Sequence, residues 1–141
     1  MTYHFKVHEE GNGYWAECVE LLGCLTQADS MEQMRKNAEE ALNLYLEEPE
    51  ESSLSFPLPK NDLKGKNIIE VPVQPGVALS VLLRKYRDDH HFTQKDIAQR
   101  LGMKNLYSYQ RLERRSNPSL QTLHKLKQVF PDLSVDYVLQ E

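Results

Sequence analysis

Apolar and polar side chains alternate with a period of two at the start of the chain. Tyr3, Phe5 and Val7 are each flanked by polar residues, a pattern that predicts a strand with one buried face. Residues 10–13 contain an Asn-Gly pair, which favours a tight turn, so residues 14–19 are expected to return antiparallel to the first strand. The pattern therefore predicts a β-hairpin.

Two more strands and one long helix are predicted next. The third strand is expected over residues 24–28 and the fourth over residues 68–73, where Pro72 lacks a backbone N–H and so favours an edge position. Between them, Ser30 can cap a helix that runs to about Glu47. Helical spacing predicts a buried face of Met31, Met34, Ala38, Ala41, Leu42 and Tyr45, and a solvated face of Glu32, Arg35, Lys36, Glu39, Glu40 and Asn43.

In the second half of the chain the period changes to that of helices. One helix is predicted over residues 77–88, and another begins after Thr93, which can cap it together with Asp96. Gly102 follows the last apolar residue of this helix, and glycine commonly ends helices because it adopts positive φ without steric cost. The signals predict a turn directly after Gly102.

After that turn, a helix is predicted over residues 106–115. Leu106, Tyr109 and Leu112 are spaced to face inward. The outward residues offer hydrogen-bonding groups and two guanidinium groups, which suit base edges and phosphates: Tyr107, Ser108, Gln110, Arg111 and Arg114. The alternative is the solvated face of an ordinary helical hairpin, since this geometry also occurs in proteins that do not bind DNA.

The C-terminal segment predicts two more helices. Ser119 can cap the first, whose apolar residues are Leu120, Leu123, Leu126, Val129 and Phe130. A short last helix is expected within residues 133–139. A hydrophobic tail of this kind often serves dimerisation.

The formal net charge of -4 at pH 7 conceals a strong asymmetry. Residues 1–73 contain 6 Lys and Arg against 14 Asp and Glu, whereas residues 74–141 contain 11 against 7. Only the second half suits a polyanion, and the acidic first half would attract a basic partner. From the predicted strands and helices, we expect an α+β protein of two domains. Residues 1–73 form a small antiparallel sheet with one covering helix and a wrapping loop at 49–67, and residues 74–141 form an all-helical domain.

Targeting signals and reactive sites are not indicated. No apolar run approaches the roughly 20 residues that a membrane-spanning helix needs, so a cytoplasmic location without membrane association is expected. Cys18 and Cys24 lack the spacing of a zinc or redox motif, which predicts reduced, buried thiols. The pattern indicates no metal site, no cofactor and no enzyme activity.

Particular residues of the second half resemble the Cro/repressor-type helix-turn-helix family. They are Gln94, Ala98, Gly102, the Arg111-Leu112-Glu113 triplet and residues 117–123. The resemblance implies that Gln94 grips a phosphate of operator DNA, while Asn105 to Tyr107 and Arg111 enter the major groove. Between Gly102 and Glu113 the chain has one residue more than the common pattern, so Leu106 and Tyr107 can exchange roles. The DNA-binding candidates are Gln94, Lys95, Lys104, Asn105, Leu106, Tyr107, Ser108, Gln110, Arg111 and Arg114.

The first half resembles the HicB antitoxin family over residues 3 to about 73. The resemblance rests on Gly13-Tyr14-Trp15, residues 21–27, residues 37–42 and Tyr45-Leu46, with Leu22 where proline is common. It implies a partial ribonuclease-H-like fold without that fold's activity, a HicA-type mRNA interferase toxin as partner, and autorepression of the operon. The predicted toxin contacts are Glu17, Glu20, Ile68, Ile69, Glu70 and Val71. Because one helix reads few base pairs, we expect at least a homodimer on the operator.

Two other functions stay open at this point. Tyr3, Phe5, Tyr14 and Trp15 could line a small-molecule pocket, which would make the protein a ligand-sensing repressor, although aromatic residues at strand spacing are more often core. A metal-dependent nuclease would need several converging carboxylates. The first strand has no carboxylate on its apolar face before residue 9, which argues against this chemistry.

Overall fold

The computed structural model describes residues 1–47 and 55–140 of the chain. These residues divide into two units. The first contains Met1–Leu46, Pro57–Gln74, Leu139 and Gln140, and the second contains Glu47, Ser55, Phe56 and Pro75–Val138. The division lies near the expected boundary after residue 73, but Ser55 and Phe56 group with the second unit and Leu139 and Gln140 with the first. Of the wrapping loop predicted over residues 49–67, residues 49–54 lie outside the described residues, and residues 55–67 contain no helix or strand.

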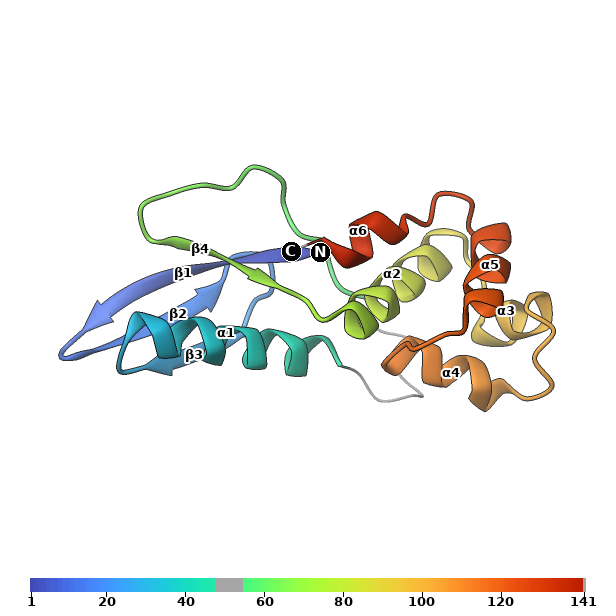
Figure 1. The fold of residues 1–141 in the computed structure, drawn as a ribbon, viewed down its shortest axis with the longest axis horizontal. Coiled ribbons are helices and arrows are strands. Elements are labelled where there is room, and N and C mark those ends of the chain that lie inside the picture. The colour runs from blue at the N-terminus through green and yellow to red at the C-terminus, as the bar shows by residue number, and fades with distance from the viewer. Residues whose placement is uncertain (48–54, 141) are drawn as a thin grey trace. The chain divides into compact units, whose positions relative to one another are not determined.

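The first unit is built on a four-stranded antiparallel sheet (Figure 1). Its strands are β1 (Thr2–Glu10), β2 (Gly13–Cys18), β3 (Leu25–Ala28) and β4 (Ile68–Pro72), in the order β3-β2-β1-β4. The four predicted strands are therefore confirmed, and so is the edge position of β4 and its proline. Together with the helical second unit, the sheet confirms the α+β class.

The β1–β2 turn differs in detail from the prediction. Glu10 lies opposite Gly13, so Gly11 and Asn12 are the two turn residues, and not the Asn12-Gly13 pair. Gly11 has a φ of +59°, a conformation that glycine adopts without steric cost. The hairpin signal was correct, but the glycine that makes the turn possible is the preceding one.

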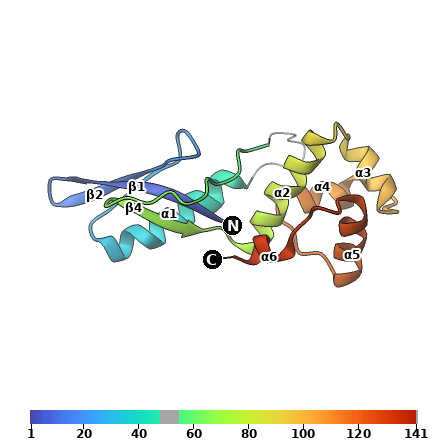
Figure 2. The same cartoon turned by 90° about the horizontal axis from the view of Figure 1, so that it is seen from above.

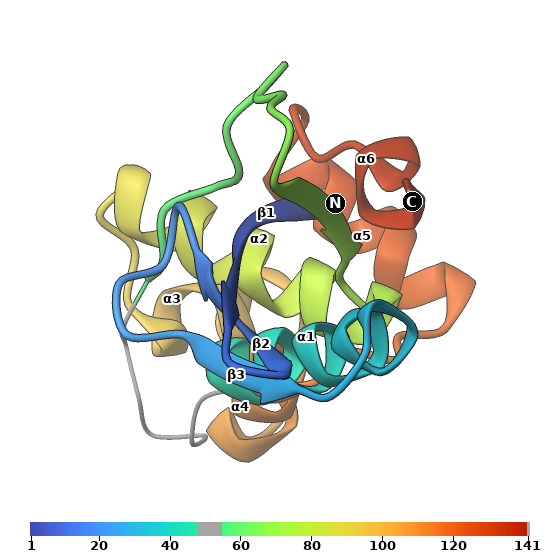
Figure 3. The same cartoon turned by 90° about the vertical axis from the view of Figure 1, so that its left-hand side faces the viewer.

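Helix α1 (Met31–Leu46) covers one face of the sheet (Figures 1 and 3). Its N-terminus is capped as predicted, since the Ser30 hydroxyl accepts the Gln33 N–H at 3.1 Å. The buried side chains Phe5, Ala16, Met34, Ala38 and Leu42 fill the layer between sheet and helix. Burying these apolar side chains is the main source of stability in so small a unit.

Asn43 was expected on the solvated face of α1, and that expectation was wrong. Its side chain is buried, its amide donates to the Glu39 carbonyl at 2.7 Å, and its oxygen accepts the Gln74 N–H at 2.8 Å. The two hydrogen bonds offset the cost of burying the amide.

The second unit consists of five helices (Figure 2): α2 (Pro75–Asp89), α3 (Gln94–Arg100), α4 (Leu106–Arg114), α5 (Leu120–Val129) and α6 (Val135–Leu139). Helix α2 is central, because every residue from Val77 to Arg84 is buried. Ile97, Tyr109 and Leu126 complete the core from the neighbouring helices. Ser119 caps α5 as predicted, accepting the Thr122 N–H at 3.1 Å.

One apolar residue of α5 does not take the predicted inward position. Leu120 is 85% exposed, whereas Leu126 and Phe130 are buried. Leu120 is the first residue of the helix, where a side chain has little of the fold beneath it. Within the described residues, no helix has the length and apolar character needed to cross a bilayer.

The prediction of reduced, buried cysteines is confirmed. Cys18 and Cys24 are free thiols, and both are buried. A hydrogen bond with Cys24 and burial raise the pKa of Cys18, which keeps this thiol protonated.

Gly76 is the point where the start of α2 approaches the end of α4. Its carbonyl accepts the Ser116 N–H at 2.9 Å and the Ser80 hydroxyl at 3.0 Å. A Cβ at position 76 would lie 2.6 Å from the Ser116 carbonyl oxygen, so the backbone would have to shift.

We expect Gly76→Ala to lower the free energy of unfolding by about 1–3 kcal/mol, measured by urea denaturation. Gln128→Ala, on the exposed side of α5, is the control; equal stability of the two variants would contradict the contact.

Candidate nucleic-acid interface

Helix α3 begins and ends as its sequence predicts. The Thr93 hydroxyl accepts the Asp96 N–H at 3.0 Å, and the Asp96 carboxylate accepts the Thr93 N–H at 2.8 Å. This backbone hydrogen bond lowers the pKa of Asp96, so the carboxylate stays charged at the positive end of the helix. At the other end, Gly102 takes a φ of +70°.

The start of α4 is fixed by Asn105. Its side-chain oxygen accepts the Ser108 N–H at 2.9 Å and the Ser108 hydroxyl at 3.0 Å. Asn105 is thus the N-cap of α4. Asn105 and Ser108 are both DNA-binding candidates, and these hydrogen bonds join their polar side chains to each other.

Leu106 was expected to face inward, and this prediction was wrong. Leu106 is 39% exposed and Tyr107 is 54% exposed, so both are accessible at the start of α4. Tyr109 and Leu112 are buried as predicted. The hydrophobic character of Leu106 predicted a buried side chain. The side chain is exposed because the helix begins at this residue and no preceding turn covers it.

The remaining cationic candidates are accessible. Lys95, Lys104, Arg111 and Arg114 are exposed, on α3, on the turn and on α4. The Arg111 guanidinium lies over the Tyr107 ring, 5.9 Å from its centroid. The sequence interpretation missed Arg100, which is also exposed and lies 4.4 Å over the Phe92 ring centroid.

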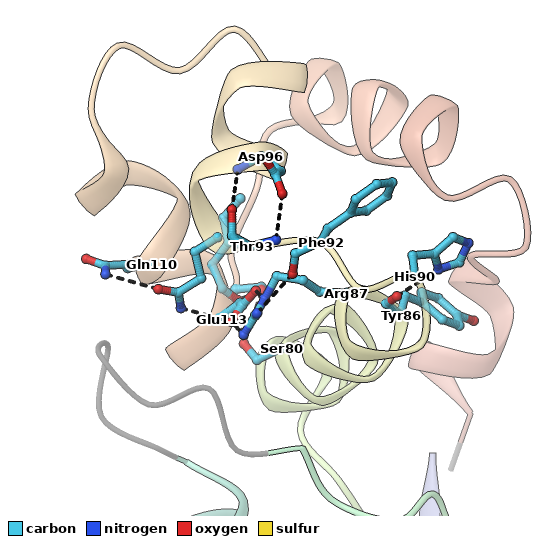
Figure 4. Close-up of polar contacts among 12 residues, drawn as sticks. Ser80, Tyr86, Arg87, His90, Phe92, Thr93, Asp96, Gln110 and Glu113 are labelled. Carbon is cyan, nitrogen blue, oxygen red and sulfur yellow. Dashed lines mark hydrogen bonds and ion pairs between the residues drawn. The ribbon is translucent and has the colours of Figure 1, made fainter.

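Gln94 and Gln110 connect the two helices of the motif instead of projecting freely. The Gln110 amide donates to the Gln94 oxygen at 3.1 Å, and the Gln94 amide donates to Glu113 at 3.1 Å (Figure 4). Gln110 was expected to point outward, but it is half-buried. Gln94 lies at the first residue of α3, and its contact with a phosphate stays a prediction.

Glu113 is the buried centre of this network, and sequence reasoning assigned it no role. Arg87 of α2 donates to its two carboxylate oxygens at 2.6 and 3.0 Å, and the Arg87 guanidinium also donates to the Phe92 carbonyl at 3.3 Å (Figure 4). Burial alone would lower the pKa of Arg87, but its hydrogen bonds with Glu113 outweigh that effect and raise it. The only signal in the sequence was an acid inside the predicted apolar spacing of α4.

This pairing leaves the outer side of the motif cationic. Glu113 is the only acid of α4, and it is buried against Arg87. Arg111 and Arg114 are exposed on the same helix. An exposed helix of this kind can bind phosphates and present side chains to base edges.

Five of the six candidate contact residues of the first unit lie on strands, and they fall on opposite sides of the sheet. In the strand register Lys6 lies opposite Glu17 and Ile68, and His4 lies opposite Glu70. Glu17, Ile68 and Glu70 therefore share the face away from α1. Ile69 and Val71 are buried on the other face with the core, so their side chains are not available to a partner.

Glu20 was also predicted as a contact residue, and the structure assigns it an internal role. One carboxylate oxygen lies 2.7 Å from the His4 ring and accepts the Lys60 N–H at 3.1 Å, and the other accepts the His4 N–H at 3.0 Å. The Glu20 side chain is 1% exposed. A carboxylate with this many partners holds the chain together and is not free for a ligand.

The face away from α1 remains accessible over much of its area. We call it the open sheet face and define it by Lys6, His8, Trp15, Glu17, Leu25, Gln27, Ile68 and Glu70. Leu25 is 59% exposed, and the His8 and Trp15 rings stack with centroids 4.2 Å apart. The described residues contain no group of three His, Cys, Asp or Glu side chains able to hold a metal ion.

Tyr109 is buried beside Glu113 and makes the free energy of unfolding depend on pH in the alkaline range. Burial, followed by the charge of Glu113, raises the pKa of Tyr109. The unfolded chain loses the phenol proton near pH 10 while the folded chain retains it, so stability is present below that pH and falls above it, by up to about 1.4 kcal/mol per pH unit. Tyr109→Phe should reduce this slope in urea unfolding between about pH 9 and 11. Exposed Tyr107→Phe is the control, and equal slopes in both variants would contradict the assignment.

Two comparisons relate the chain to known proteins. A helix-turn-helix family model matches residues 83–138, which include α3, α4 and α5, and this supports DNA-binding transcription regulation. A UPF0150 protein of Helicobacter pylori strain J99 is 37% identical over 74 residues, which are 52% of this chain and 94% of that protein. With nearly the full length of that relative matched, the chain belongs to the UPF0150 protein family.

Proposed function

We propose that the protein is an antitoxin. Its first unit binds and neutralises a small basic ribonuclease of the HicA type, and its second unit represses the operon of the pair by binding operator DNA. The observation that carries the proposal is the opposite charge of the two halves, combined with an accessible surface on each. The resemblance of residues 3–73 to HicB antitoxins supports the nature of the partner.

The open sheet face is the surface that we assign to the toxin. It combines aromatic and aliphatic area, from Trp15 and Leu25, with the carboxylates of Glu17 and Glu70. A ribonuclease must present a positive surface to RNA, so an acidic protein that covers this surface both attracts the enzyme and excludes its substrate.

The DNA-binding function rests on the exposed side of α4. Arg111 and Arg114 face solvent, and the network of Gln94, Gln110 and Glu113 holds α4 against α3. A single helix in one groove binds weakly, so we propose that a cytoplasmic homodimer occupies two half-sites about one helical turn apart.

A ligand-sensing repressor is the second candidate. Four aromatic residues were considered as the walls of its pocket, but Tyr3 and Phe5 have no exposed surface and belong to the core. Only Tyr14 and Trp15 reach the surface. A thermal-shift screen of small molecules against the purified protein tests this function, and a strong specific shift would favour it over the antitoxin.

Reversing charge on the open sheet face tests whether the toxin binds there. We expect Glu17→Lys with Glu70→Lys to weaken binding of the basic protein encoded by the adjacent reading frame by about tenfold or more, because complementary charge is replaced by repulsion. Calorimetry and RNA cleavage assays measure the loss. Glu40→Lys, at an exposed position of α1, is the control, because it makes the same kind of charge change elsewhere in this unit. If this control weakens binding equally, the toxin does not dock on the open sheet face.

Substitutions on the second unit should show the converse behaviour. Arg111→Ala should cost about 1–3 kcal/mol in operator binding and relax sequence preference, whereas Lys104→Ala should weaken binding to all sequences and reduce the salt slope by about one. Fluorescence anisotropy at several salt concentrations distinguishes the two. Both variants should retain full affinity for the toxin, and loss of toxin binding would contradict the division of functions between the units.

A further inference from the structure

Helix α4 begins with two exposed side chains that are mainly apolar. Asn105 caps the helix, so Leu106 and Tyr107 occupy its first two positions, with 39% and 54% of their surfaces exposed. Singly exposed apolar residues are common on protein surfaces. Here two of them are adjacent, at the end of the helix that a helix-turn-helix inserts first into the major groove.

Charge around this pair identifies the kind of surface that covers it. Lys104 precedes it, while Arg111 and Arg114 follow on the same helix, and all three are exposed. The one acid of α4, Glu113, is buried and paired with Arg87. A second protein chain with an apolar patch would offer no anionic groups to Lys104 and Arg111, whereas DNA phosphates would neutralise both.

The major groove presents one apolar group among its hydrogen-bonding edges, the C5 methyl of thymine. A leucine side chain cannot donate or accept a hydrogen bond, so its favourable contact in the groove is with this methyl group. The face of the Tyr107 ring is similarly apolar, and Arg111 lies against it, 5.9 Å from the centroid. Arg111 is thereby placed next to the tyrosine, where it can reach a neighbouring guanine or phosphate.

We propose that Leu106 and Tyr107 are specificity-determining residues that recognise thymine methyl groups at adjacent positions of the operator half-site. The proposal rests on the DNA-binding function of α4 and adds the chemical group that the helix recognises.

Deoxyuridine tests this proposal directly, because it lacks the methyl group and keeps every hydrogen-bonding group of thymine. The full-length protein is first used to select its operator from a random duplex library. Each thymine of the selected site is then replaced singly by deoxyuridine. At one or two positions of each half-site we expect a loss of about three- to tenfold in affinity.

Variants assign the effect to the side chains. Leu106→Ala and Tyr107→Ala should each bind thymine and deoxyuridine equally at one of these positions, so that the ratio of affinities falls to about one. This ratio is independent of the fraction of folded protein. Leu120→Ala, which removes an 85% exposed leucine from α5, is the matched control and should keep the ratio of the unmodified protein.

The contrary outcomes distinguish failure of the methyl assignment from failure of DNA binding itself. Equal affinity for thymine and deoxyuridine at every position overturns the methyl assignment and leaves DNA binding intact. The same holds if the discrimination persists in both alanine variants, or if these variants change only the oligomeric state in sedimentation. Failure to enrich any sequence overturns the DNA-binding function itself, and the methyl assignment with it.

Discussion

The buried ion pair between Arg87 and Glu113 is the constraint on which the second unit depends. Both side chains are almost fully enclosed, at 8% and 1% exposure, and two short hydrogen bonds join them. Glu113 also accepts the Gln94 amide, so one carboxylate receives donors from α2 and α3 while it belongs to α4. Removing one partner would leave an uncompensated buried charge, at a cost of about 3–5 kcal/mol. The pair therefore fixes the rotation of α4 about its axis.

That rotation has a direct consequence for function. With Glu113 held inward, the helical period places Tyr107, Arg111 and Arg114 on the outer side, whereas Leu106 is exposed because it lies at the start of the helix. The side that faces solvent then has cations and apolar groups but no acid. In the first unit the equivalent organising feature is α1, which covers one face of the sheet and leaves the other for a partner. Each unit thus has one side devoted to its own core and one side available for binding.

Most elements could be predicted from the sequence because their signals are local. The capping pair Thr93 and Asp96, the C-terminal glycine of α3 and the alternation of Tyr3, Phe5 and Val7 are each complete within a few residues. The failures concern polar side chains whose partners are distant. Glu113 meets Arg87 from 26 residues away, and Glu20 binds the Lys60 N–H from 40 residues away. Leu106 and Leu120 fail differently, because the first residue of a helix is not covered by a preceding turn.

A double-mutant cycle at Arg87 and Glu113 tests the central claim most directly. Arg87→Met, Glu113→Leu and the double variant would be compared in urea unfolding and, under conditions where all are folded, in operator binding. We predict that each single substitution costs about 3–5 kcal/mol of stability and that the double variant costs at least about 2 kcal/mol less than the sum, with operator affinity reduced in both single variants. Additive losses of stability, together with unchanged operator affinity, would show that the pair does not orient α4.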